Sequence, residues 1–361
     1  MQSKITTLLV PYSKGNLHLK NHLVMAPMTR SRAIDNLPND LMAEYYGQRT
    51  GAGLIITEGT APTADALSYA RIPGIFTQAQ IEGWKKTTTA VHKDGTKIFL
   101  QIMHTGRIGH YHNLPGGAIL VGASDIKAAG QIYTDTDGMQ DFSEPKALTT
   151  EGIEAVIEGY VNAAKNAIAA NFDGIELHGA NGYLLEQFLN PNVNNRTDAY
   201  GGSIENRAKL TLEVAERAVA AIGNNKVGIR LSPFSKTGDL QPYDALEVHN
   251  TYAFLATQLN KLKLTYIHLV MNPLIPQATI DGIRAGFDGT IIKTGGFTPE
   301  TAEEALINGS ADLVAFGKAF LSNPDFARRI AMGATLNPVD FTTLYSPATS
   351  TGYTDYPTLQ S

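Results

Sequence analysis

The sequence contains no cysteine among its 361 residues. Disulfide bonds, thiolate metal sites, iron–sulfur clusters and thiol nucleophiles are therefore excluded. Only 17% of the residues are charged, the formal net charge is -5, and the basic residues are scattered along the chain. Because proteins that bind nucleic acid concentrate lysine and arginine on one face, we expect no nucleic-acid partner.

Long hydrophobic runs are also missing. No segment approaches the roughly 20 consecutive apolar residues that a membrane-spanning helix needs, so we expect no membrane partner. Residues 1–5 lack the apolar region of a signal peptide, and we expect a cytoplasmic protein. Since 43% of the residues are hydrophobic, the chain can bury a sizeable core.

Short apolar runs alternate along the chain with longer helical patterns. Several runs are apolar at successive positions, which is typical of parallel strands covered on both faces. The predicted strands are residues 22–25, 54–57, 98–101, 174–178, 227–231, 266–270, 290–294 and 313–316. Eight β-then-α units predict an α/β protein with a (β/α)8 TIM barrel, which usually takes about 250 residues. We expect one domain over residues 1–361.

Two sequence motifs predict the first residues of helices. Thr77 with Gln80 predicts a capping box, and Thr298 followed by Pro299 predicts an N-cap with proline at the first helical position.

Two further segments fall outside the barrel. Residues 107–146, after the third strand, are rich in glycine, proline and aspartate, with β-prone pieces at 118–121 and 131–134. We interpret them as a β-rich lid insertion, bearing a hairpin, over the barrel mouth. Within residues 1–20, the alternation of Leu17 and Leu19 predicts an N-terminal hairpin that closes the barrel bottom.

The predicted end of the fourth strand carries His178, Asn181 and Tyr183 within six positions. In this fold the active site lies at the carboxyl ends of the strands. His178 and Asn181 can donate hydrogen bonds to one carbonyl oxygen and stabilise the enolate that hydride attack generates, while Tyr183 can supply a proton. The alternative for a single strand-end histidine is a structural residue with its hydrogen bonds satisfied. We expect no metal, since no other ligand stands nearby at metal-binding spacing.

Other strand ends supply groups that suit a flavin. Gln101 offers an amide, Arg230 a cation and Thr29 a hydroxyl, and such groups tune the electronics of a flavin ring. Two alternatives remain. Arg230 could form a salt bridge with Glu58 or Glu176, and Gln101 could only satisfy loop backbone.

Glycines follow the last two predicted strands. Gly295 and Gly296 precede a helix start, and Gly317 precedes Lys318. The loops after strands seven and eight are the usual phosphate site of a TIM barrel, although such glycines are also common in ordinary turns.

These residues together resemble the Old Yellow Enzyme family of FMN-dependent ene-reductases, over nearly the whole chain. The segments that carry the resemblance are residues 26–30, 53–60, 101–107, 178–183, 195–207 and 352–357. The resemblance implies a TIM barrel with non-covalent FMN, and NAD(P)H as the reductant. The substrates it implies are electron-poor alkenes such as enones, enals, maleimides and nitroalkenes, reduced in a ping-pong cycle.

The resemblance also assigns roles to residues. It implies that the isoalloxazine is held by Ala26, Pro27, Met28, Thr29, Gly59, Gln101 and Arg230, and the phosphate by Gly295, Gly296, Gly317 and Lys318. It implies that His178 and Asn181 bind the substrate oxygen and that Tyr183 donates the proton. Tyr69, Met103 and Tyr345 would line the substrate side, although each could instead cover core.

The chain departs from the family pattern at two positions. Many relatives carry tryptophan where Met103 stands, and arginine is usual at the position of Lys318. Lysine keeps the charge but loses the bidentate geometry of arginine. Two other hypotheses stay open. One is a TIM-barrel lyase or isomerase with a phosphorylated substrate, which would need a strand-end lysine near the barrel axis to form a Schiff base. The other is a non-catalytic flavin-binding protein, which would not need Tyr183 as an acid.

Overall fold

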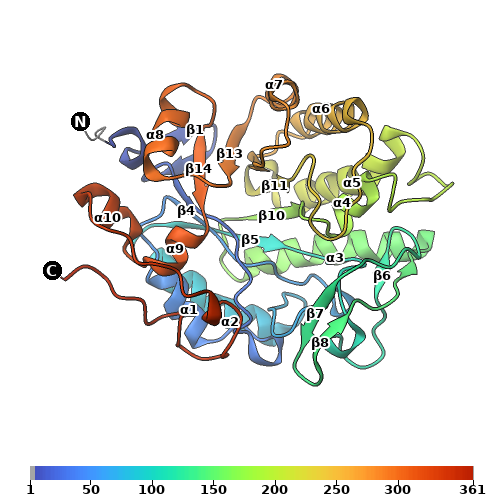
Figure 1. The fold of residues 1–361 in the computed structure, drawn as a ribbon, viewed down its shortest axis with the longest axis horizontal. Helices are drawn as coiled ribbons and strands as arrows, with labels where there is room; N and C mark the ends of the chain where they lie inside the picture. Colours follow the sequence, from blue (N-terminus) through green and yellow to red (C-terminus); the bar gives the residue numbers. More distant parts are fainter. Residues whose placement is uncertain (1–4, 361) are drawn as a thin grey trace.

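Eight parallel strands form a closed barrel in the computed structural model, which describes residues 5–360 (Figure 1). In chain order the strands are β3 (Leu23–Met25), β4 (Leu54–Ile56), β5 (Lys97–Ile102), β10 (Gly174–Gly179), β11 (Val227–Leu231), β12 (Tyr266–Val270), β13 (Thr290–Thr294) and β14 (Leu313–Phe316). Each predicted strand is confirmed, with bounds that differ by at most one residue at either end. The predicted α/β barrel is therefore correct.

Helices connect the strands and cover the outside of the barrel. They are α1 (Asp40–Gly47), α2 (Gln78–His92), α3 (Thr150–Ala169), α4 (Leu184–Leu189), α5 (Ile204–Ile222), α6 (Ala245–Lys261), α7 (Gln277–Gly286), α8 (Pro299–Ile307), α9 (Lys318–Ser322) and α10 (Phe326–Met332). Single 3-10 turns lie at Thr7–Leu9, Ile34–Asn36, Ala64–Ala66, Tyr111–Asn113, Asn224–Lys226 and Phe341–Thr343. Over residues 5–360, no helix combines the length and the apolar character needed to cross a bilayer.

Both predicted helix starts are confirmed. The Thr77 side chain accepts from the Gln80 backbone, and the Gln80 side chain accepts in return from the Thr77 backbone. Pro299 is the first residue of α8, after Thr298 as its N-cap. These caps satisfy backbone N–H groups that have no partner within the first helical turn.

The barrel bottom is closed by the predicted hairpin, formed by β1 (Tyr12–Lys14) and β2 (Leu17–Leu19). Tyr12, Leu17 and Leu19 are buried in one cluster with inward-facing strand residues such as Phe99 and Tyr266. A hydrophobic plug at this end removes apolar surface from water and leaves the opposite end, where the strands finish, as the accessible mouth.

The segment between β5 and α3 contains two small sheets, one pairing β6 (Val121–Gly122) with β9 (Lys146–Ala147) and the other β7 (Gln131–Thr134) with β8 (Gly138–Asp141). The β7–β8 hairpin, green at the lower right of Figure 1, confirms the prediction for residues 131–134. The prediction of a strand at 118–121 is wrong except at its last residue. The Ala118 N–H closes a turn onto the Pro115 carbonyl, which prevents an extended strand from starting there.

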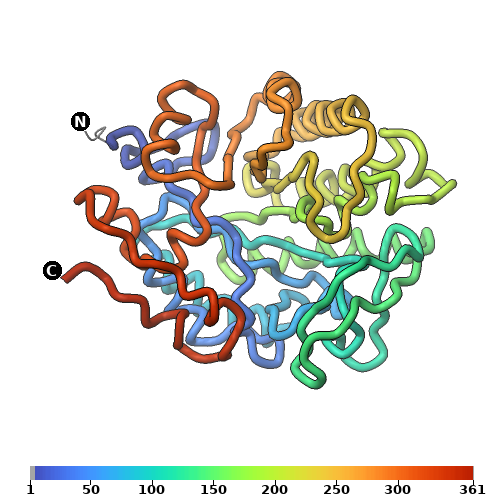
Figure 2. The backbone as a smooth tube through the Cα atoms, in the orientation of Figure 1, coloured from blue at the N-terminus to red at the C-terminus, as the bar shows by residue number. Residues whose placement is uncertain are grey.

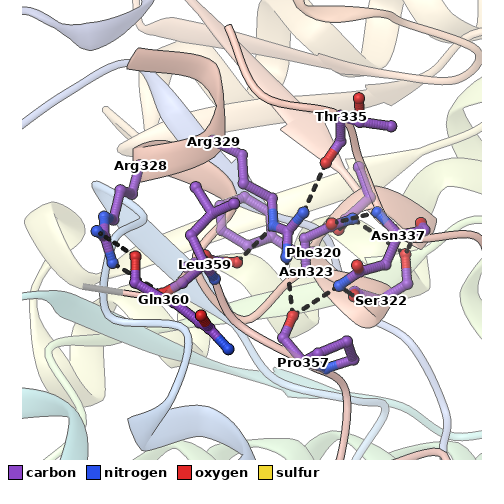
Figure 3. A network of polar contacts seen from close by, with 12 residues as sticks. Phe320, Ser322, Asn323, Arg328, Arg329, Thr335, Asn337, Pro357, Leu359 and Gln360 are labelled. Carbon is purple, nitrogen blue, oxygen red and sulfur yellow. Dashed lines mark hydrogen bonds and ion pairs between the residues drawn. The ribbon is translucent and has the colours of Figure 1, made fainter. Parts of the chain in front are cut away.

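The C-terminal tail folds back along the molecule beside the N-terminal part of the barrel (Figure 2). The guanidinium of Arg32 donates to the carbonyls of Thr343, Leu344 and Thr351. Further along, the guanidinium of Arg329 in α10 donates to the Pro357 carbonyl (Figure 3).

The same network reaches α9. Asn337 links α9 to the C-terminal tail. Its side-chain amide donates to the carbonyl of Ser322, at the end of α9, and to the carbonyl of Pro357 in the tail (Figure 3). Buried arginines thus hold the tail, and with it Tyr345, in a fixed place above the strand ends.

Candidate active site

A cavity of about 410 Å³ opens at the mouth of the barrel, between the strand ends and the lid hairpin. This volume lies within the range of small-molecule sites, about 300–1,000 Å³. The predicted site residues that line it are Pro27, Thr29, Gly59, Tyr69, Gln101, Met103, His178, Asn181, Tyr183, Arg230 and Tyr345. They come from positions as far apart in the sequence as Pro27 and Tyr345, and the fold brings them together.

His178 is buried near the end of β10, beside Arg230 on β11. Its Nδ1 accepts the Ala180 backbone N–H at 3.3 Å, so the neutral ring carries its proton on Nε2. Burial lowers the pKa of His178 well below its ordinary value, and the charges of Arg230 and His268 act in the same direction. The imidazole is therefore a neutral donor on the cavity wall.

Asn181 follows in a left-handed backbone conformation, with φ of 58°, and Gly182 continues the turn with φ of 77°. Asparagine tolerates this region better than most residues. The Asn181 backbone N–H donates to the hydroxyl of Ser232 at 2.8 Å, which ties the turn to the end of β11. The turn places Asn181 on the same cavity wall as His178.

Tyr183 is the N-cap residue of α4. Its hydroxyl donates to the Tyr69 hydroxyl at 3.2 Å, and its ring meets the His178 ring edge-on with centroids 4.9 Å apart. Burial raises the pKa of Tyr183 above its ordinary value, although its hydrogen bond with Tyr69 opposes the shift. The phenol therefore keeps its proton at neutral pH, as a proton donor must.

Gln101 is held by a buried carboxylate. Its Nε2 donates to Glu176 Oε1 at 2.8 Å, and the other oxygen of Glu176 lies 2.9 Å from Nδ1 of His268. The alternative that Gln101 only satisfies loop backbone is therefore wrong. Glu176 takes one of the two amide N–H groups of Gln101, so the second N–H and the carbonyl oxygen remain for the cavity.

Arg230 has no ion-pair partner in the part of the chain that the structure describes, so the alternative of a salt bridge with Glu58 or Glu176 is wrong. Its Nε is buried without a hydrogen-bond partner. Burial lowers the pKa of Arg230, and the negative charge of Glu176 opposes that shift. A guanidinium remains charged in proteins, and an unpaired buried charge is costly, so this group calls for an acceptor in the cavity.

These features fit the edge of a flavin ring. The unpartnered Arg230, the Gln101 carbonyl and the Thr29 hydroxyl line one cavity, and together they match the donors and acceptors of an isoalloxazine.

The predicted phosphate residues lie at the ends of β13 and β14. Gly295 has φ of 128°, and an added Cβ would lie 2.5 Å from the Met271 carbonyl oxygen, so only glycine fits there. Gly296 faces open space, as a position that approaches a ligand should. Lys318 is exposed, with Nζ 5.0 Å from the centre of the Phe341 ring.

Several predicted cofactor residues do not line the 410 Å³ cavity: Ala26, Met28, Gly295, Gly296, Gly317 and Lys318. Ala26 is buried, and its backbone N–H donates to the Phe316 carbonyl at 3.0 Å. Met28 lies against Gly317, since an added Cβ there would be 3.3 Å from the methionine sulfur. Met28 therefore contacts the end of β14. The cofactor roles of these six residues stay predictions.

The structure adds cavity residues that were not predicted from sequence. Ser31 and Arg71 line the mouth, and the lid contributes Ile132, Tyr133 and Met139. The Arg71 guanidinium donates to the Tyr345 carbonyl at 3.1 Å, which connects it to the C-terminal tail. The β-prone pattern located the hairpin, but local sequence does not say which of its side chains reach the barrel.

Comparison with known proteins gives consistent matches over the whole length. A family model described as the NADH:flavin oxidoreductase / NADH oxidase family matches residues 7–337. The 12-oxophytodienoate reductase 1 of Oryza sativa subsp. japonica is 42% identical, over 98% of this chain and 93% of that protein. The flavin oxidoreductase hxnT of Emericella nidulans is 39% identical, over 99% of both. A solved structure of morphinone reductase in complex with tetrahydroNAD superposes with a TM-score of 0.94, at 40% identity over 98% of each chain.

Proposed function

The chain belongs to the NADH:flavin oxidoreductase / NADH oxidase family, and we propose that it is an FMN-dependent enzyme that uses NAD(P)H to reduce activated C=C bonds. The substrates would be α,β-unsaturated carbonyl or nitro compounds. The observation that supports this most is one cavity that combines a neutral imidazole donor, a carboxamide and a protonated phenol with an unpaired guanidinium.

The chemistry that bound FMN supplies is hydride transfer, taken from NAD(P)H and given to the β-carbon of the alkene. Pro27, Thr29, Gly59, Gln101 and Arg230 would hold the ring, because they line the cavity around the strand ends. The guanidinium of Arg230 would stabilise negative charge on that ring. The turns at the ends of β13 and β14 would hold the phosphate.

His178 and Asn181 would bind the substrate oxygen. The Nε2–H of His178 and the carboxamide of Asn181 donate to one carbonyl or nitro oxygen and stabilise the enolate or nitronate that forms as the β-carbon gains hydride. A neutral imidazole suits this task because its Nε2–H donates a hydrogen bond while the proton stays on the ring. Tyr183 then gives its hydroxyl proton to the α-carbon, so that one hydride and one proton are added across the former double bond.

A spectroscopic experiment tests the proposal. The isolated protein, or protein reconstituted with FMN, should absorb as a flavoprotein, lose that absorbance with NAD(P)H under anaerobic conditions, and regain it when 2-cyclohexenone is added, with cyclohexanone as the product. Colourless protein that cannot be reconstituted would refute the cofactor and favour the lyase or isomerase hypothesis. Flavin that NAD(P)H reduces but no activated alkene reoxidises would favour a flavin-binding protein without this activity.

A further inference from the structure

The Asn181 turn rests on a buried carboxylate, Glu186, in the first half of α4. Glu186 Oε2 accepts the Gly182 backbone N–H at 2.7 Å, and Oε1 accepts the Ser232 hydroxyl at 2.7 Å. The same Ser232 oxygen accepts the Asn181 N–H at 2.8 Å. Glu186 therefore reaches both residues of the turn, one directly and the other through Ser232.

Among residues 5–360 no cation forms an ion pair with Glu186, and its hydrogen-bond partners are donors. The hydroxyl of Tyr252 in α6 donates to Oε1 at 2.8 Å, as the third direct bond. Tyr243, ahead of α6, faces the same small cavity of about 80 Å³, and Lys236 lies on its exposed side. Burial raises the pKa of Glu186 to about 7, while its hydrogen bonds with Gly182, Ser232 and Tyr252 lower it.

We propose that Glu186 is the positioning residue that holds the Asn181 carboxamide in place for the substrate oxygen, and that protonation of Glu186 releases the turn. The inference rests on the proposed function, in which Asn181 binds that oxygen. It assigns no direct contact with substrate to Glu186.

The contacts of Glu186 explain how its protonation would release the turn. A carboxylate can accept all three direct bonds, whereas a carboxylic acid has a proton on one oxygen and loses acceptor capacity there. The hydroxyls of Ser232 and Tyr252, both on Oε1, can rotate to a new partner, whereas the Gly182 N–H on Oε2 is fixed by the backbone. Protonation on Oε2 therefore breaks the direct bond to the turn. Asn181 and Gly182 both have positive φ, so the turn depends on such outside contacts to keep its shape.

The proposed catalytic groups and the tyrosines around Glu186 do not titrate in the same range. The pKa of His178 is lowered well below its ordinary value and that of Tyr183 is raised, in both cases first by burial. Tyr252 and Tyr243, which face Glu186, have raised pKa values, also because of burial. Glu58, next to the cavity-lining Gly59, also has its pKa raised to about 7 by burial. A change in the binding of a neutral ligand near pH 7 is therefore assigned to Glu186 only if it disappears in Glu186→Gln.

The test is the dissociation constant of 2-cyclohexenone for the oxidised holoenzyme between pH 6 and 9, followed by flavin absorbance. No turnover occurs without NAD(P)H, and the ligand is neutral throughout. In wild type the dissociation constant should rise about tenfold below pH 7, which corresponds to the loss of one hydrogen bond. In Glu186→Gln it should be about tenfold weaker and independent of pH, since the amide nitrogen cannot accept.

Tyr252→Phe is the matched control. It removes one hydrogen bond to the same carboxylate but leaves both connections to the turn. At pH 9 its affinity should equal that of wild type, and the midpoint of its pH profile should move upward, because a donor that favours the ionised form is gone. If Glu186→Gln fails to fold, Ser232→Ala replaces it, with weaker binding expected because the connection to the Asn181 N–H is cut.

Wild-type affinity and an unchanged pH profile in Glu186→Gln would overturn the inference. Failure of the proposed function looks different: wild type itself would not bind the enone. Amide hydrogen exchange over residues 178–189, measured without substrate, then decides the positioning role. Protection lost at low pH and in Glu186→Gln supports it, and equal protection in all samples overturns it.

Discussion

Replacing Tyr183 with phenylalanine separates the proton-donor role from every other contribution of this side chain. The ring would keep its edge-on contact with His178, at 4.9 Å between centroids, and its place as the N-cap of α4. Only the hydroxyl and its 3.2 Å hydrogen bond to Tyr69 disappear. Cavity shape and cofactor contacts should therefore stay as they are, and the variant should fold.

The expected magnitude follows from what is lost. A positioned general acid contributes about 10²–10⁴-fold to the rate of the step it assists. Reduction of the alkene should slow by that factor in Tyr183→Phe, whereas flavin reduction by NAD(P)H, which needs no proton donor to carbon, should change less than about threefold. The cost in unfolding free energy should be about 1 kcal/mol, the usual net value of one hydrogen bond.

Stopped-flow absorbance measures the two half-reactions separately, first with NAD(P)H and oxidised protein and then with 2-cyclohexenone and reduced protein. Tyr69→Phe is the matched control, because it removes the other hydroxyl of the same hydrogen bond and leaves the Tyr183 proton in place. Its alkene half-reaction should slow by less than about tenfold. Equal losses in both half-reactions of Tyr183→Phe, or a larger loss in Tyr69→Phe, would remove Tyr183 from the proton-donor role.

The remaining predictions concern binding and stability. A phenol added to the oxidised holoenzyme should bind as its phenolate over the flavin and give a long-wavelength charge-transfer band that disappears in His178→Ala. A band that persists would mean that His178 does not hold the phenolate oxygen. Arg230→Met should weaken FMN binding about tenfold to a hundredfold, the loss of a charged hydrogen bond, and unchanged affinity in a fluorescence titration of the apoprotein would contradict the flavin contact. Burial raises the pKa of Glu58 from 4.5 to about 7, so its contribution to stability is full below pH 4.5 and is lost as the pH rises through 7. In urea unfolding, the stability of wild type relative to Glu58→Gln should therefore fall by about 3 kcal/mol between those pH values, and a constant difference would show that Glu58 does not titrate in this range.

Much of the barrel could be predicted from sequence because its signals are local. Apolar runs mark the strands, and the caps at Thr77 and Thr298 mark helix starts, so strand bounds were predicted to within one residue. The piece at 118–121 is the exception, since its β-branched residues follow a glycine turn and pair only at Val121. Propensity favours a strand there, but the number of residues available for pairing decides it.

The site residues could be predicted only in part. Placing His178, Asn181, Tyr183 and Arg230 at one mouth follows from the rule that the carboxyl ends of barrel strands converge. The hydrogen-bond partners of these residues cannot be predicted from that rule. Neither Glu186, nor the lid residues on the cavity wall, stood out in the sequence, because their importance comes from contacts made across the fold.

The order of the strands, the closure of the barrel and the location of its mouth were determined by the sequence, because a periodic apolar pattern leaves few ways to bury every strand. The chemical state of the site was decided by the tertiary structure. Gln101 meets Glu176 from 75 residues away, and Ser232 meets Glu186 from 46. Which nitrogen of His178 carries the proton, why Arg230 lacks a partner and where Glu186 titrates all depend on such neighbours and on the water they exclude.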